Sequence, residues 1–145
     1  MQGKTHAACG ALVGLGTARL IQENALMSDI VPSVEYFTFA VGLGVIGGLL
    51  PDIDIQTSKL GQHIKLLSAI IRELFGHRRL FHWAFLYIAL FGMAAWQLPA
   101  YFQYTLFLFL GILSHLFLDL FNKVGIPFLN PYGKRIHLAN IKSGG

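Results

Sequence analysis

The stretch YFQYTLFLFLGILSHLFLDLF, residues 101–121, contains no charged side chain before Asp119. A helix needs roughly 20 apolar residues to cross the hydrocarbon core of a bilayer, which is about 30 Å thick. This stretch therefore predicts a membrane-spanning helix. His115 and Asp119 are four residues apart and so lie on one face of that helix, inside its apolar part.

The rest of the chain also has the composition of an integral membrane protein. Apolar types make up 54% of the 145 residues and charged types 12%, whereas soluble domains carry about 25% charged residues. The mean hydropathy is +0.58. The length predicts a single domain, residues 1–145. Further apolar stretches at 6–22, 33–50 and 80–98 predict an all-α fold, a four-helix transmembrane bundle.

Glycines in the first two of these stretches indicate that their helices are neighbours. Small residues let helix backbones approach closely in lipid, although glycine is common in membrane helices generally. The glycines are Gly10, Gly14, Gly16, Gly42, Gly44, Gly47 and Gly48.

The positions of lysine and arginine predict the orientation. Ten of the eleven lie before residue 6, in the connection 51–79 or after residue 121, whereas the connections at the other side carry acidic residues or no charge. Because cytoplasmic loops are enriched in positive charge, both termini and the 51–79 connection are expected in the cytoplasm.

The 51–79 connection contains an amphipathic segment at 60–75. Its apolar residues fall at helical spacing: Leu66, Leu67, Ile70, Ile71 and Leu74. Such a helix fits two roles, either lying in the membrane interface or packing as a lid on the end of the bundle.

Ionisable side chains are expected to converge at the cytoplasmic ends of the four helices. An aspartate inside the apolar zone costs about 2.5–3.5 kcal/mol on insertion scales, and a divalent cation would offset this cost. Histidine and carboxylate are the ligands of zinc and related metals, although a proton relay uses the same groups. The candidate ligands are His6, Asp52, Asp54, His77, His82, His115 and Asp119.

Two arginines stand beside these candidate ligands. Arg78 and Arg79 lie in HRRLFHW, residues 77–83, and guanidinium groups bind phosphate through paired hydrogen bonds. The alternative is that both only set the topology.

The chain resembles a family of small bacterial inner-membrane proteins known as membrane-bound metal-dependent hydrolases. The resemblance rests on motifs in the family's order across nearly the whole chain: TH before a glycine-rich helix, LLPDIDI, HRRLFHW, SHLFLDLFNKVGIP and the closing NP. The family is grouped with zinc-dependent phospholipase C and single-strand-specific zinc nucleases.

The resemblance implies a multi-pass protein of the bacterial inner membrane and a specific set of metal ligands. These are His6, Asp52 or Asp54, His77 or His82, His115 and Asp119, with Asp119 bridging two ions. This chain has Trp83 where the family has serine. After Asp119 it offers only His137 as a further histidine, which favours one or two ions over three.

The sequence thus predicts a membrane-embedded, zinc-dependent hydrolase that cleaves a phosphoester of a lipid or lipid-linked substrate at the cytoplasmic interface. Asp52 or Asp54 would act as the general base, and Arg78 or Arg79 would hold phosphate charge. The alternative is a nonenzymatic membrane protein, either a metal or proton transport component or a bundle braced by a structural metal. No nucleic-acid partner is expected, and the oligomeric state is left open.

Overall fold

The computed structural model describes residues 3–23, 33–54, 63, 65–75, 80–127 and 130–139. Its α-helices are α1 (Gly3–Glu23), α2 (Val34–Leu49), α3 (Lys65–Phe75), α4 (Ala84–Gln97) and α5 (Phe102–Leu120). Its shorter elements are the 3-10 helices η1 (Leu50–Asp54), η2 (Leu80–His82) and η3 (Pro99–Tyr101) and the strands β1 (Ile126–Pro127) and β2 (Arg135–Ile136).

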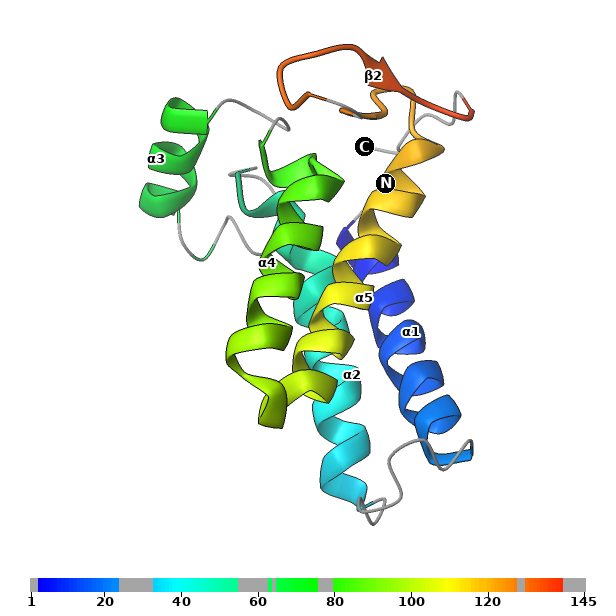
Figure 1. The fold of residues 1–145 in the computed structure, drawn as a ribbon. Helices are drawn as coiled ribbons and strands as arrows, with labels where there is room; N and C mark the ends of the chain where they lie inside the picture. Colours follow the sequence, from blue (N-terminus) through cyan, green and yellow to red (C-terminus); the bar gives the residue numbers. More distant parts are fainter. Residues whose placement is uncertain are drawn as a thin grey trace.

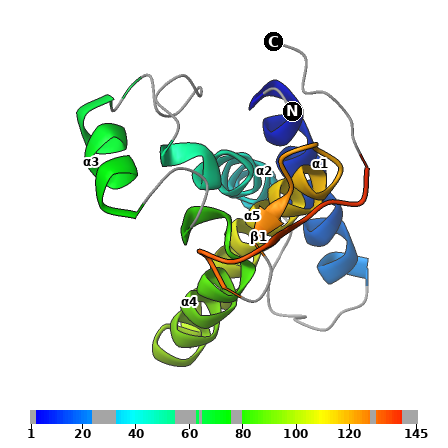
Figure 2. The same cartoon turned by 90° about the horizontal axis from the view of Figure 1, so that it is seen from above.

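Four of the helices form a bundle. α1, α2 and α5 pack against one another, and α4 packs against α5. α3 stands to one side of this bundle in both views (Figures 1 and 2) and contacts η1. The start of α1, η1, η2 and the end of α5 all lie at the end of the bundle that carries β2 (Figure 1).

The all-α prediction is confirmed, with one small addition. β1 and β2 form an antiparallel pair in which Ile126 faces Ile136 and Pro127 faces Arg135. The backbone N–H of Leu138 donates to the Leu120 carbonyl at 2.7 Å, which ties this hairpin to the end of α5. Strands of two residues have no alternating pattern long enough to be recognised in a sequence.

Two helices within the described residues are long and apolar enough to cross a membrane. They are Val34–Ile53, with 20 residues, and Pro99–Leu120, with 22 residues. α4 is apolar but has only 14 residues, which corresponds to about 21 Å. By length and composition, two of the four predicted spans therefore meet the criterion.

Close glycine contacts hold α1 and α2 together, which confirms that these helices are neighbours. A Cβ atom at Gly10 would overlap the carbonyl of Gly44, and one at Gly48 would overlap the carbonyl of His6. Gly111 of α5 meets Gly44 in the same way. The three backbones thus touch directly, and any side chain at these positions would separate them.

Valine substitutions at Gly44 and Gly42 test this packing. Gly44→Val should destabilise the protein by about 1–3 kcal/mol or more because the added atoms overpack the contact with Gly10. A Cβ at Gly42 would meet nothing within 4 Å, so Gly42→Val on the same helix is the matched control and should have little effect. Thermal unfolding in detergent measures both; equal losses would contradict the proposed role of the glycine contacts.

Candidate metal centre

Five of the predicted ligands lie together at one end of the bundle. All five are buried, and they come from four separate elements: His6 from α1, Asp52 from η1, His82 from η2, and His115 and Asp119 from α5. The cluster therefore joins segments that are far apart in the sequence.

Short 3-10 turns, rather than the long helices, present Asp52 and His82. Pro51 follows the last turn of α2 and lacks a backbone N–H, so the regular α-helical hydrogen bonding cannot continue through it, and the chain tightens into η1. The predicted third helix begins at Ala84 instead of residue 80 because Trp83 is extended (φ −94°, ψ 111°). His82 thus lies in η2, before the helix.

Carboxylate and imidazole atoms face each other at nearly uniform distances. His82 Nε2 lies 3.6 Å from Asp52 Oδ1 and 3.4 Å from Asp119 Oδ2. His115 Nε2 lies 3.7 Å from Asp52 Oδ1 and 3.6 Å from Asp119 Oδ2. Each histidine nitrogen therefore faces the same two oxygens.

These distances fit a bound ion better than direct hydrogen bonds. Hydrogen bonds from nitrogen to oxygen measure about 2.7–3.2 Å, shorter than all four separations. Ligand atoms about 2.0–2.1 Å from a tetrahedral zinc ion are about 3.3–3.4 Å apart. Each of the four histidine–aspartate separations is thus close to the distance between two ligands of one zinc ion.

The hydrogen bonding of His115 also suits metal binding. Its Nδ1 lies 2.7 Å from the carbonyl oxygen of Gly48, and since a carbonyl can only accept, Nδ1 carries the proton. Nε2 then has a lone pair directed at the cluster. Metal-binding histidines commonly donate their other N–H to such an acceptor.

His6 lies on the other side of His115. The two rings stack with centroids 3.8 Å apart, and His6 Nε2 lies 3.5 Å from Asp119 Oδ1. Both ring nitrogens of His6 are buried and have no hydrogen-bond partner among the described residues. Because buried polar atoms are nearly always bonded, His6 has the environment expected of a ligand.

The described residues offer two overlapping groups of three metal ligands, which share His115. Two ligand groups are present, one of His6, His115 and Asp119 and one of Asp52, His82 and His115. His115 has one available nitrogen and can serve only one ion. A second ion would therefore have His6 and Asp119 Oδ1, with its remaining ligands supplied from elsewhere.

Asn122 is part of the site, although the sequence analysis did not identify it. It is buried and its side-chain nitrogen donates to Asp119 Oδ1, which fixes the orientation of that carboxylate. Its position three residues after Asp119, just beyond the end of α5, resembles ordinary helix termination, so the sequence gives no specific signal.

The remaining predicted site residues lie outside the part of the chain whose side chains are described. These are Asp54, His77, Arg78 and Arg79. Where the sequence left a choice between Asp52 and Asp54, and between His77 and His82, the structure places Asp52 and His82 in the cluster. His63 and His137 are exposed and belong to neither ligand group.

Comparison with known proteins gives the family. The model of the YdjM inner membrane protein family matches residues 1–145. The chain belongs to that family. Its membership supports the membrane association that the composition predicts, whereas the relationship to metal-dependent hydrolases and phospholipase C stays a prediction.

Two curated relatives show the extent of the similarity. The chain is 33% identical over 95 residues to the uncharacterized protein YvsG of Bacillus subtilis, covering 66% of this chain and 59% of the relative. It is 31% identical over 125 residues to the inner membrane protein YdjM of Escherichia coli, covering 80% of this chain and 61% of the relative. The chain thus matches about three fifths of their lengths. No solved structure matches.

Alanine substitutions of the clustered histidines should remove bound metal. His82→Ala and His115→Ala each take away one nitrogen of the Asp52–His82–His115 group, so zinc content measured by elemental analysis of detergent-purified protein should fall to background. His63→Ala and His137→Ala remove exposed histidines and should retain the parent's zinc. Equal zinc content in all four folded variants would contradict the assignment.

Removal of the Asn122 amide should weaken metal binding without abolishing it. Loss of a hydrogen bond to a ligating carboxylate commonly costs about 10–100-fold in affinity, so Asn122→Ala should show a loss of this size in competition with a chelator of known affinity. The unfolding temperature of metal-free protein serves as the control for a general loss of stability. Unchanged affinity would show that Asn122 does not orient Asp119 for binding.

Proposed function

We propose that the protein is a membrane-embedded, metal-dependent phosphoesterase acting on a lipid or lipid-linked substrate at the membrane surface. The observation that carries the proposal is the cluster of three histidines and two aspartates at the end of a bundle with two membrane-length helices. Histidine and carboxylate ligands are typical of hydrolytic zinc sites. The family is named for its membrane location, which supports a substrate in the same membrane.

In this proposal the clustered residues divide their roles. His82, His115 and Asp119 hold the ion, since catalytic zinc sites have three protein ligands and keep one position open. A divalent cation makes water nucleophilic near neutral pH and offsets the charge of a phosphoryl group. Asp52 Oδ1, 3.6 Å from His82 Nε2, is placed to accept the proton of the attacking water.

The exposed face of α3 supports a position at the membrane surface. Leu66, Ile70 and Leu74 follow one another at intervals of four residues and are 77%, 46% and 67% exposed. Ser68 is fully buried, in a helix that contacts η1, the turn carrying Asp52. The three apolar side chains therefore do not pack on the bundle as a lid requires, and they suit insertion into the interface beside the site.

The proposal includes the number of membrane spans and their orientation. Four spans, with α1 and α4 crossing beside the two longer apolar helices, would place the cluster and both termini at the cytoplasmic face, as the distribution of lysine and arginine predicts. Arg78 and Arg79 precede η2 in the sequence and would bind the substrate phosphate from that face.

A structural metal site is the second candidate, and one observation favours it. Asp52 Oδ1 and Asp119 Oδ2 each face the same two histidine nitrogens, and sites in which the protein supplies all four ligands are typically structural. In that case Asp52 would be a ligand, and the ion would brace four segments of the bundle.

Asp52→Asn separates the two candidates. If Asp52 is the base, the variant should retain zinc but hydrolyse phosphoesters about 10²–10⁴-fold more slowly. If Asp52 completes a structural site, the variant should lose zinc. Zinc content and ³¹P NMR of protein incubated with vesicles of bacterial polar lipids, including phosphatidic acid, measure both properties.

The parent and His137→Ala serve as positive controls in the same vesicles, because His137 is exposed and outside both ligand groups. The phosphoesterase is supported if the parent and His137→Ala both hydrolyse the substrate and Asp52→Asn retains zinc but does not. If the zinc-loaded parent leaves every phosphoester intact, the phosphoesterase proposal is contradicted and the structural metal site is favoured.

A further inference from the structure

A crevice between α4 and α5 begins beside the ligand cluster. It has a volume of about 200 Å³ and is lined by residues of both helices and by Leu50. At one end lie Leu50, Tyr87 and Ile112, and the lining continues to Ala94 and Thr105. From Tyr87 to Ala94 the helix rises about 10 Å.

The described residues of the lining present a hydrocarbon surface. Two of them carry hydroxyl groups, and both hydroxyls donate to backbone carbonyls: Tyr87 to Phe81 at 2.9 Å and Thr105 to Phe102 at 2.8 Å. The other lining side chains are aliphatic or aromatic. A polar ligand would lose its hydration here without compensation, whereas a hydrocarbon chain would not.

Three lining residues of the crevice connect it to the candidate metal centre along the chain or by a hydrogen bond. Asp52 follows Leu50 by two residues, and His115 follows Ile112 by one turn of α5. The Tyr87 hydroxyl is bonded to the carbonyl of Phe81, the residue before His82. One end of the crevice thus lies next to the ligands, and the other points toward η3, at the opposite end of α4.

We propose that this crevice binds one hydrocarbon chain of the lipid whose phosphoester lies at the ligand cluster. A lipid in a bilayer has its phosphate at the surface and its chains directed to the midplane, the same direction in which the crevice leaves the ligands. Its length of about 10 Å fits within one leaflet, which is half of a core about 30 Å thick. The inference rests on the proposed function and narrows the substrate class to phosphoesters attached to a long hydrocarbon chain.

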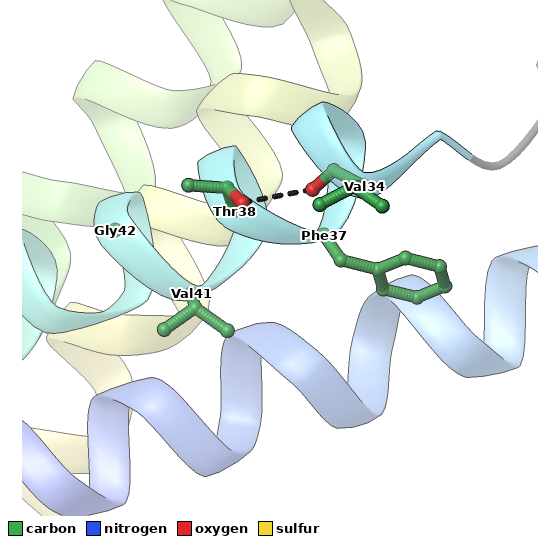
Figure 3. Close-up of a pocket in the computed structure, with 5 residues that line it drawn as sticks. All are labelled: Val34, Phe37, Thr38, Val41 and Gly42. Atoms are coloured by element: carbon green, nitrogen blue, oxygen red, sulfur yellow. Dashed lines mark hydrogen bonds between the residues drawn. The ribbon is translucent and has the colours of Figure 1, made fainter.

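A second apolar crevice provides an internal control. It lies along the first half of α2, lined by Val34, Phe37, Thr38, Val41 and Gly42, with α1 beside it (Figure 3). The Thr38 hydroxyl is likewise bonded to a backbone carbonyl, that of Val34, at 2.8 Å. Since Asp52 follows the far end of α2, this crevice is similar in chemistry but remote from the ligands.

Photo-cross-linking tests the proposal without requiring hydrolysis. The probe is phosphatidic acid with a diazirine in the middle of one acyl chain, incorporated into phosphatidylcholine vesicles with the zinc-loaded protein. Cross-links mapped by mass spectrometry should concentrate on Leu90 and Phe91, which line the α4–α5 crevice. Equal labelling of the α1–α2 crevice would indicate ordinary contact with bulk lipid and overturn the proposal.

Filling each crevice with tryptophan gives the matched comparison. Ala94→Trp should reduce labelling of Leu90 and Phe91 about 15-fold, the loss expected when two buried methylene groups are excluded. Val41→Trp, in the control crevice, should leave that labelling unchanged. Labelling that persists in Ala94→Trp contradicts the proposal.

The two proposals fail in different ways. Specific labelling of the crevice by a lipid that the parent never hydrolyses would count against the phosphoesterase and leave the binding site standing. If Ala94→Trp hydrolyses long-chain and short-chain substrates with the same KM values as the parent, the chain-binding crevice is refuted. The phosphoesterase proposal is not.

Discussion

The rest of the structure depends on the burial of two carboxylates and three imidazoles inside an apolar bundle. Asp119 is 1% exposed, and His6, His82 and His115 are fully buried. An isolated carboxylate in such an environment carries a large desolvation cost, so its surroundings must supply positive charge. The histidine nitrogens lie too far from the aspartate oxygens for short hydrogen bonds. A divalent cation between them would satisfy the charges, and on this proposal the need to hold it accounts for the meeting of distant segments at one point.

Backbone packing makes this meeting possible. The glycines at the α1–α2 contact bring the His6 backbone against Gly48, and the Gly48 carbonyl in turn accepts the proton of His115 Nδ1. One small residue thus positions two candidate ligands from different helices. A larger side chain at Gly48 would displace both the helix and the hydrogen bond, so helix packing and the positions of the candidate ligands are coupled in this fold.

The sequence predicted the helices well because apolar length and helical spacing are local properties. The stretch 101–121 corresponds to η3 and α5 nearly residue for residue, and the spacing of His115 and Asp119 fixed their shared face. The position of Asp52 depends on how the chain turns after Pro51, and that of His82 depends on the extended backbone of Trp83. Asn122 and the Gly48 carbonyl gave no signal, because their roles arise from tertiary contacts that ordinary helix-end and glycine patterns do not distinguish.

X-ray absorption spectroscopy of the zinc-loaded protein tests the central claim most directly, because it reports the ligand atoms themselves. Coordination by His82, His115 and Asp119, with Asp52 or water completing the shell, predicts about four nitrogen or oxygen neighbours at about 2.0–2.1 Å. It also predicts the outer-shell scattering of about two imidazole rings. A shell containing sulfur, for which the chain has only Cys9, or an oxygen shell without imidazole scattering, would contradict the account.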